Sequence, residues 1–282
     1  MPNSQPSNFT SHHEVADDGT VAFHCSQDAE AWPWLALHPG HPIIVQNMNY
    51  LASVEASAAR GTLDTAKWSA LTETGWTCGD LKAEHAVRGV AQPLSGTGKR
   101  AHYWIKFYGA RGDLLYDMNG AGVVFQNRDF ESWRQQAKTR SGSDPDAPTD
   151  GFAYAPASAL GVVSDAHRFL SPLRNTSSAS ATAASADGLV TRANGFPPAN
   201  PYLDGSGDHV NASHIAEIAR QFAGLLTERP GLTVAGGDMR FRRYVELGVP
   251  FTVSGEQSRN DITLSLTQRG EPCAEVRLHV KT

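Results

Sequence analysis

The sequence predicts an α+β fold built from two similar units, each with one long helix and one antiparallel sheet. Apolar residues at helical spacing over residues 47–60 are followed by four runs with period-2 alternation. The same order recurs later, where a helical run over residues 212–226 precedes four further strand-like runs. With 282 residues, of which 40% are hydrophobic, the chain is large enough to bury a core in each unit.

The first unit is predicted to begin with a strand over residues 20–26, followed by a turn-rich segment. In the helix over residues 47–60, Met48 and Ala52 share an apolar face with Glu55, the one acid on that face. Glycine-containing turns separate the strands that follow, which indicates an antiparallel meander. These strands are expected over residues 67–77, 84–93, 101–108 and 114–126.

The second unit repeats this order of elements. Asp187-Gly188 resembles Asp18-Gly19 in its sequence context, and a histidine-containing turn at residues 208–211 precedes the helix over 212–226. The strands that follow are expected over residues 232–245, 250–257, 261–268 and 273–281.

Composition predicts four consecutive regions. Residues 1–18 are polar and indicate a flexible tail, and residues 140–186 are rich in Ser, Ala, Thr, Gly and Pro, which is typical of a linker. Within that linker the more apolar residues 152–170 are expected to pack partly on a unit. The two units are then residues 19–139 and residues 187–282.

Charge and composition exclude several classes of function. A net charge of −5 shows no basic bias, which argues against a nucleic-acid partner, and no apolar run is long enough to cross a membrane. The three cysteines form no Cys-x-x-Cys pair, so we expect no disulfide framework, no zinc site and a reducing, cytoplasmic location. We also expect no other metal and no resident cofactor, because neither a metal-ligand constellation nor a phosphate loop is found.

One short motif in the first half carries a resemblance to a known family. The sequence Trp34-Leu-Ala-Leu-His38-Pro-Gly40-His-Pro42 resembles the histidine loop of 3-hydroxyacyl-ACP dehydratases and of polyketide-synthase dehydratase domains. These enzymes have the hotdog fold, in which a curved sheet wraps a long helix. The family has Pro-Gly at the helix start, where this chain has Gln46-Asn47. Two such units imply a double hotdog.

The second half carries three further similarities. Glu217-Ile-Ala-Arg-Gln221-Phe-Ala-Gly resembles the dehydratase helix whose glutamate is catalytic, and residues 240–245 resemble the following strand. Asp208-His209-Val-Asn resembles the motif that precedes the helix of acyl-CoA thioesterases. A weaker similarity, over residues 208–221, is to the A-factor synthases.

The dehydratase resemblance implies syn elimination of water from a 3-hydroxyacyl thioester. That reaction needs a base near the α-carbon and an acid near the leaving hydroxyl, and histidine and a carboxyl group suit these roles. In the family the two groups come from different protomers, so His38 would face Glu217. His209 would face Glu55 in a second site.

The same resemblance implies where the substrate binds. Backbone N–H groups at the helix starts, near Asn47 and Asn211, would polarise the thioester carbonyl. Arginines on the second unit could meet a phosphopantetheine phosphate or an acidic carrier protein. The predicted substrate-binding residues are Gly40, Asn47, Asn211, Gln221, Arg240 and Arg242.

Each of these residues also has a structural interpretation. His38 and His41 are equally suited to capping a turn, and Glu55 to pairing with Arg60 or with a backbone donor. Glu217 falls on the more polar side of its helix, where a solvated acid near Arg220 is expected. Asn211 is typical of a helix N-cap, and charged strand ends such as Arg240, Arg242 and Arg243 are typically solvated.

Together these observations predict an acyl-thioester-processing enzyme of lipid or natural-product biosynthesis. The leading hypothesis is a lyase, a 3-hydroxyacyl-ACP or -CoA dehydratase or hydratase, with acyl carrier protein or coenzyme A as partner. The alternatives are a thioesterase in which His209 activates water with Asp204 or Asp208, an A-factor-synthase-like acyltransferase, and a non-catalytic acyl-binding scaffold. The chain is expected to be a pseudo-dimeric monomer or a homodimer.

Overall fold

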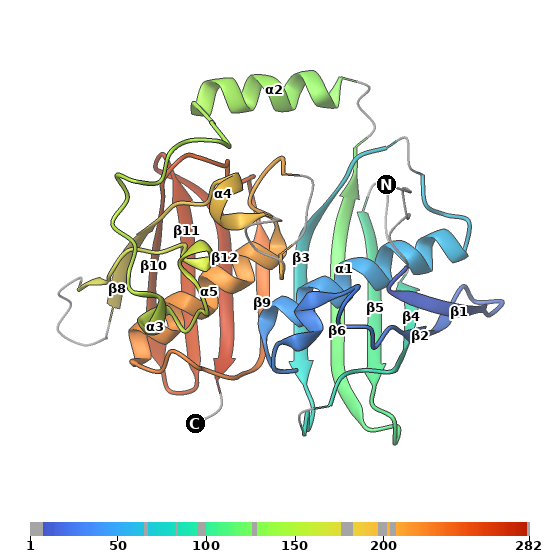
Figure 1. Ribbon diagram of the computed structural model, residues 1–282. Helices are drawn as coiled ribbons and strands as arrows, with labels where there is room; N and C mark the ends of the chain where they lie inside the picture. The colour runs from blue at the N-terminus through green and yellow to red at the C-terminus, as the bar shows by residue number, and fades with distance from the viewer. Residues whose placement is uncertain are drawn as a thin grey trace. The chain divides into compact units, whose positions relative to one another are not determined.

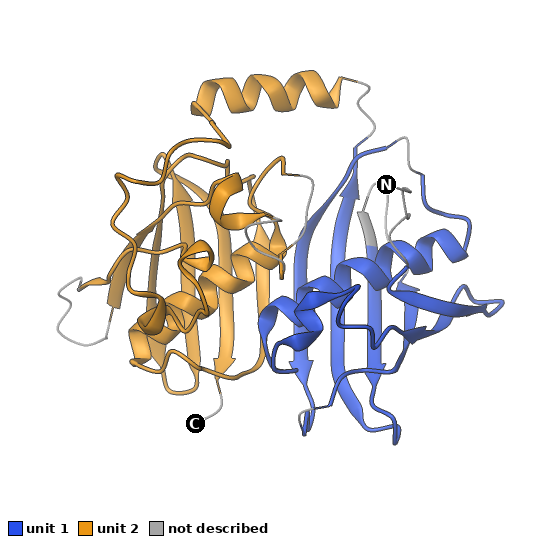
Figure 2. Ribbon diagram, viewed as in Figure 1, with its two compact units in different colours: residues 1–126 blue, residues 127–282 orange. Residues whose placement is uncertain are grey.

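The computed structural model describes residues 8–64, 67–82, 84–94, 100–125, 129–175, 183–196, 202–203 and 207–280. The chain divides into two compact units, Met1–Gln126 and Asn127–Thr282 (Figure 2). The sequence predicts the first unit to end at residue 139, whereas the structure assigns residues 127–139 to the second unit.

Unit 1 is an antiparallel sheet with one long helix, α1 (Pro42–Ala59), lying across it (Figure 1). Its strands run in the order β1-β2-β4-β5-β6-β3. A short 3-10 helix, η1 (Pro33–Ala36), precedes α1. The strands are β1 (Thr10–Val15), β2 (Val21–Cys25), β3 (Ser69–Cys78), β4 (Arg88–Leu94), β5 (Arg100–Tyr108) and β6 (Leu114–Val124).

The core of unit 1 lies between α1 and the sheet. Ile44, Met48 and Ala52 on the helix are fully buried, as are Phe23 and Phe107 on the strands. The helix begins at Pro42 rather than near Asn47, because His41 caps it and proline is favoured at the first helical position. The predicted helix start was therefore wrong.

Unit 2 also has one long helix, α5 (Ala212–Thr227), lying across an antiparallel sheet (Figure 1). Its strands run in the order β9-β12-β11-β10-β8-β7. The strands are β7 (Arg174–Asn175), β8 (Ala183–Gly188), β9 (Val234–Phe241), β10 (Phe251–Ser258), β11 (Asp261–Gln268) and β12 (Glu271–Val280). The remaining helices are α2 (Phe130–Ser141), α3 (Ala157–Leu160), η2 (Asp165–His167) and α4 (Arg192–Gly195).

The two units share one strand topology, although neither contains the four-strand meander that the sequence predicts. In unit 1, β4, β5 and β6 are consecutive neighbours, but β3 pairs with β6. In unit 2, β10, β11 and β12 are consecutive, and β9 pairs with β12. Alternation of apolar residues shows which residues of a strand share a face, but it does not show which strand lies beside it. The order of the strands in each sheet could therefore not be predicted from the sequence.

The predicted N-terminal tail was wrong for the residues that the structure describes. Thr10–Val15 forms β1, which pairs with β2, and Phe9 is 1% exposed. The Glu55 carboxylate accepts hydrogen bonds from the N–H groups of Phe9 at 2.9 Å and Thr10 at 2.6 Å. One acid on α1 thus ties the polar N-terminal segment to the unit.

The predicted linker is structured wherever it is described. It contains α3, η2 and β7, and β8 begins at Ala183. Leu160, Phe169 and Leu170 from this region are fully buried, and α3 packs against α5. The sequence marks residues 175–185 as the most flexible part of the chain, but Asn175 belongs to β7 and residues 183–185 belong to β8, so that prediction was wrong at both ends. Residues 176–182 lie outside the described residues. Residues 155–170 therefore cover a face of α5 that the sequence pattern assigns to solvent.

Candidate functional site

His209 and Asp208 form a histidine–carboxylate pair in unit 2. The Nδ1 atom of His209 lies 3.2 Å from Oδ2 of Asp208, and the His209 side chain is 28% exposed. The backbone that follows His209 is held by two contacts, because Val210 bridges to Val245 and the Asn211 side chain accepts a hydrogen bond from the His214 N–H to cap α5. The pair is therefore held on a rigid segment at the start of the central helix.

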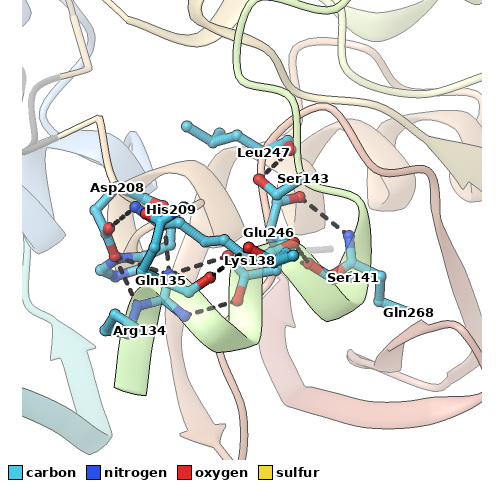
Figure 3. Close-up of polar contacts among 11 residues, drawn as sticks. Arg134, Gln135, Lys138, Ser141, Ser143, Asp208, His209, Glu246, Leu247 and Gln268 are labelled. Carbon is cyan, nitrogen blue, oxygen red and sulfur yellow. Dashed lines mark hydrogen bonds and ion pairs between the residues drawn. The ribbon is translucent and has the colours of Figure 1, made fainter. Parts of the chain in front are cut away.

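Arg134 of α2 also binds the Asp208 carboxylate, at the same oxygen that lies near Nδ1 of His209 (Figure 3). Its Nε and Nη2 atoms donate to Oδ2 of Asp208 at 2.9 and 2.8 Å. The same guanidinium donates to both carboxylate oxygens of Glu246, at 2.7 and 2.9 Å. Lys138, one helical turn after Arg134, also pairs with Asp208. Asp208 thus has cationic partners from two residues of one helix.

Glu246 is held in its turn by Gln268 of β11. The Gln268 side chain accepts from the Glu246 N–H at 2.8 Å and donates to the Glu246 carbonyl at 3.1 Å (Figure 3). The side chains of Arg134 and Glu246 are 5% and 7% exposed. A buried ion pair with this many hydrogen bonds is costly to break, because either partner alone would be an uncompensated buried charge.

Tyr244 provides an aromatic wall beside the pair. Its ring lies edge-on to the His209 ring, with centroids 4.5 Å apart, and the Arg134 guanidinium lies 4.3 Å from the Tyr244 centroid. Burial raises the pKa of the Tyr244 hydroxyl, so it is a neutral donor at physiological pH. The ring restricts His209 to one orientation, in which Nδ1 faces Asp208.

The electrostatics of the cluster keep Asp208 ionised. Burial acts to raise the pKa of this carboxyl group, but hydrogen bonds from His209, Lys138 and Arg134 outweigh it and hold the pKa well below the usual range. A carboxylate can only accept, so we assign the shared proton to Nδ1 of His209. In the neutral tautomer with a proton on Nδ1, the Nε2 atom is an acceptor, and no hydrogen-bond partner for it is found among the described residues.

His214 lies one turn into α5 and is fully buried. Its ring nitrogens contact Oδ1 of Asn211 at 2.7 Å and the carbonyl oxygen of Gly195. Burial lowers the pKa of His214 to about 4, against the raising effect of the Gly195 hydrogen bond. Burial therefore favours the neutral form of His214, in which only one ring nitrogen can donate to these two acceptor oxygens.

Glu217 and Gln221 lie in a second buried network of unit 2. Arg220 donates to both carboxylate oxygens of Glu217, at 2.8 and 2.6 Å, and Gln221 donates to Oε1 at 2.9 Å. Arg220 also donates to the carbonyl oxygens of Leu160 and Pro230. Glu217 is 3% exposed. The prediction that Glu217 lies on a solvated face was wrong, because residues 155–170 cover that side of α5.

In unit 1, His38 occupies an exposed turn before α1. Its Nδ1 accepts a hydrogen bond from the N–H of buried Gly40 at 3.0 Å. His41 acts similarly one step later, accepting from the Ile43 N–H at 3.3 Å. Both histidines therefore have the turn-capping contacts of the structural interpretation. The pairing of His38 with Glu217 would join different units and stays a prediction.

The other predicted site residues of unit 1, Glu55 and Asn47, have structural surroundings. The Glu55 carboxylate accepts from the backbone of Phe9 and Thr10, which is the backbone-donor interpretation, and Thr10 donates a further hydroxyl bond to it. Asn47 is 7% exposed and lies in the interior of α1. Its N–H group is not at a helix start, so the predicted carbonyl-binding role of that N–H was wrong.

The predicted substrate-binding residues of unit 2 differ in their surroundings. Asn211 is the N-cap of α5, and Gln221 is fully buried, donating to the His167 carbonyl at 2.8 Å. Arg240 and Arg242 are exposed, and Arg242 pairs with Glu275 at 2.9 Å. The structure brings neither arginine to His209.

Sequence reasoning missed Arg134, Lys138, Tyr244 and Glu246. The only signal for the first two was their i, i+4 spacing in a segment with little apolar periodicity. Asp204, the alternative base in the thioesterase hypothesis, lies outside the described residues. In the described ranges, no three His, Cys, Asp or Glu side chains form a group that could hold a metal ion. Nor is any described helix both long and apolar enough to span a bilayer.

Comparison with solved structures identifies the class of fold. The chain is similar to an acyl-ACP thioesterase from Bacteroides thetaiotaomicron, with a TM-score of 0.54 and 10% identity over 93% of this chain and 97% of that one. It is similar to a 12:0-ACP thioesterase from Umbellularia californica, with a TM-score of 0.52 and 12% identity over 85% and 89%. It is also similar to the dehydratase domain of RzxB from Pseudomonas fluorescens, with a TM-score of 0.52 and 15% identity over 97% of this chain and 98% of that one.

These similarities show that the chain has the hotdog fold, as the resemblance implied. No protein-family model matches the sequence, and no curated protein is significantly similar to it.

Proposed function

We propose that this protein is an acyl-thioester hydrolase with His209 as its general base. The observation that carries the proposal is the His209–Asp208 contact, in which a fixed carboxylate faces Nδ1 and leaves Nε2 available. A base that removes a proton from water needs an unprotonated nitrogen and a partner that stabilises the imidazolium. Both conditions are met on one rigid segment.

In the proposed reaction, Nε2 of His209 takes a proton from a water molecule as its oxygen attacks the thioester carbonyl. The tetrahedral intermediate collapses with cleavage of the C–S bond, and the imidazolium returns its proton to the departing thiolate. The products are a carboxylic acid and a free thiol. The N–H of Ala212, at the first position of α5, lies three residues after His209 and is suited to stabilise the carbonyl oxygen.

Asp208 would hold His209 in the productive tautomer without itself being protonated. Arg134 and Lys138 keep it ionised, and Tyr244 limits rotation of the imidazole. This division of roles is the one that a histidine and an orienting carboxylate have in hydrolases of unrelated folds. Arg134 is therefore a positioning residue in the proposal, because it acts through Asp208.

The carboxyl groups of this chain favour hydrolysis over elimination of water. Elimination needs a protonated acid near the leaving hydroxyl. Glu217 is paired with Arg220 and Asp208 with Arg134, so a guanidinium stabilises the carboxylate form of each acid. Dehydration by His38 and Glu217 remains the alternative that the sequence motif supports.

The substrate class is proposed from the same fold relationship. Two of the similar structures are named as thioesterases of acyl carrier protein substrates and one as a dehydratase domain. An acyl group carried on phosphopantetheine, of either acyl carrier protein or coenzyme A, is the substrate class in our proposal. The bond to be hydrolysed, the thioester, is part of such a substrate. The proposed mechanism uses no cofactor.

The experiment is to incubate the protein with saturated, 2-enoyl and 3-hydroxyacyl thioesters of coenzyme A and of acyl carrier protein. Hydrolysis is followed by release of free thiol, and hydration or dehydration by a mass change of one water. We expect thiol release, lost in His209→Gln and kept in His279→Gln. The latter is a matched control, because His279 also contacts an aspartate, Asp261, at 2.8 Å but on the exposed sheet surface.

Two outcomes would contradict the proposal. Thiol release that survives in His209→Gln would place the base elsewhere. A change of one water without thiol release, abolished by His38→Ala, would favour the dehydratase hypothesis instead. His38 is exposed, so that variant is expected to keep its fold.

A further inference from the structure

A groove of about 450 Å³ lies on the sheet of unit 1, over β1, β2, β4 and β5. Its polar lining comes from His12 and Glu14 of β1, His24 of β2, Arg88 of β4 and Tyr108 of β5. All of these residues belong to unit 1, whereas the His209 cluster belongs to unit 2. None of them takes part in the proposed hydrolysis.

Three of these side chains form a row across the strands. His24 lies directly opposite Arg88 in the β2–β4 pairing, and Arg88 lies directly opposite Tyr108 in the β4–β5 pairing. Directly opposite residues share a face of the sheet, with Cβ atoms about 4.5–5.5 Å apart. Phe23 and Phe107, their chain neighbours, are buried in the core, so the row faces away from it.

A bulge adds His12 to this row. The register of β1 against β2 shifts between Ser11 and Glu14, so His12 and His13 together lie opposite Phe23. His12 has a φ of 51°, in the left-handed region, and its ring centroid is 5.3 Å from that of His24. Bulges redirect side chains and are frequent beside binding sites. This one gives the groove a second imidazole next to the first.

The guanidinium of Arg88 is available for a ligand. Among the described residues, none forms an ion pair or hydrogen bond with its side chain, although the chain has more acidic than basic residues. A Cβ at Gly112 would lie 3.1 Å from Nη2 of Arg88, so the absence of a side chain there lets the guanidinium lie against the β5–β6 turn. The φ of +89° at Gly112 independently requires glycine.

The hydrogen-bond donors and the acidic acceptor of the groove lie at opposite ends. His12, His24, Arg88 and Tyr108 supply N–H and O–H donors at one end. Glu14 pairs with Ala22, two residues along β2 from His24, and supplies an acceptor at the other end. A phosphate group matches the donor end, because guanidinium and imidazole groups bind its oxygens with charge-assisted hydrogen bonds. A hydroxyl or amine group matches Glu14.

We propose that this groove binds a phosphate monoester whose carbon skeleton carries a hydroxyl or amine group. The phosphate contacts Arg88, His24 and His12, and the hydroxyl or amine donates to Glu14. A small sugar or polyol phosphate and a nucleotide both present this chemistry. The site is independent of the proposed hydrolysis and does not rest on it.

The test is calorimetric titration with inorganic phosphate, glycerol 3-phosphate and adenosine 3′,5′-bisphosphate, with NMR of the histidine rings. We expect all three to bind and to shift the ring signals of His12 and His24, with the monoesters tighter than phosphate. Tighter binding of the bisphosphate would indicate a nucleotide, and tighter binding of glycerol 3-phosphate a small phosphate ester. Arg88→Gln should weaken the binding of all three probes at least about tenfold, which corresponds to the loss of one charge-assisted hydrogen bond.

Two further variants separate the parts of the site. Glu14→Gln should remove the tighter binding of the monoesters relative to inorganic phosphate, because it deletes the carboxylate acceptor for the hydroxyl or amine group. It should not weaken the binding of inorganic phosphate, because it also removes a negative charge. Arg111→Gln is the matched control, since Arg111 is exposed in the next turn, pairs with Asp113 and does not line the groove. His209→Gln should leave all three affinities unchanged.

The proposal is overturned if none of the three probes binds, or if Arg88→Gln binds them as tightly as the parent protein. Glu14, Arg88 and Arg111 are exposed and His209 is partly exposed, so the variants are expected to fold. Thermal unfolding of each variant checks this. Because the readout is binding, a failure of thioester hydrolysis would not affect the result.

Discussion

Arg134 and Asp208 are joined by two hydrogen bonds to a single carboxylate oxygen, at 2.9 and 2.8 Å, from residues 74 positions apart in the chain. The contact links a surface helix to the segment that carries His209. Since the same guanidinium also holds Glu246, one side chain fixes the position of two acids. The stability of unit 2 and the geometry of the proposed site therefore depend on the same residue.

Arg134→Gln should destabilise the protein by about 3–5 kcal/mol, because it leaves buried Glu246 without its cation and Asp208 with only Lys138. Denaturant unfolding measures this change. Arg192→Gln is the control, since Arg192 pairs with Asp146 on the surface and its loss should cost about 1 kcal/mol or less. Equal effects of the two substitutions would show that the buried network contributes little.

Asp208→Asn should lower kcat for thioester hydrolysis by on the order of 10²- to 10⁴-fold while changing KM little. The amide can no longer hold the proton of His209 on Nδ1, so the tautomer with a free Nε2 is no longer favoured. Steady-state kinetics test this expectation. Asp261→Asn removes the carboxylate beside exposed His279 and should leave kcat unchanged. An unchanged kcat in Asp208→Asn would remove Asp208 from the mechanism.

His214 should make the protein less stable as the pH falls from about 6.5 to about 4. The pKa of this buried imidazole is lowered to about 4 in the folded protein from 6.5 in the unfolded chain. Its contribution to stability is therefore fully present above pH 6.5 and decreases as the unfolded state takes up the proton. Over this interval the loss amounts to about 3 kcal/mol, at 1.36 kcal/mol per pH unit.

The measurement is the free energy of unfolding between pH 7 and 4 for the parent protein and for His214→Gln. Other titrating groups, such as His85, whose pKa burial also lowers, act in both proteins and cancel in the difference. The variant should be less stable at pH 7 and should show a shallower decrease. Identical pH profiles would mean that His214 does not titrate in this way.

Glu217→Gln separates a structural role from a catalytic one. Because Glu217 and Arg220 are 3% exposed, loss of the carboxylate should destabilise the protein by about 3–5 kcal/mol. We expect kcat of the folded fraction to stay within about twofold, since Glu217 does not belong to the His209 cluster. Exposed Glu256→Gln should change neither quantity. A large fall in kcat with unchanged stability would instead support the catalytic glutamate of the dehydratase motif.

Local pattern was sufficient to predict most of the strands and both long helices. The predicted strand over residues 261–268 coincides with β11, Asp261–Gln268, because alternation of apolar residues is a local property of the sequence. The α1 start was missed because the cap is a histidine, and β1 was missed because its stabilising contact comes from Glu55, 45 residues away. The strands β3 and β6 were both predicted, but their pairing with each other was not.

By itself the sequence determined the two helix-and-sheet units and pointed to His209, since periodicity and a short motif need no knowledge of distant residues. Only the tertiary structure decided which polar groups are buried and with what they pair. Glu217 lies on the polar face of its helix in the sequence pattern, yet residues 155–170 cover it in the structure. Asp208 pairs with Arg134, which is 74 positions away in the chain. The physical reason is that the ionisation state of an acid depends on the charges and cover that folding brings to it.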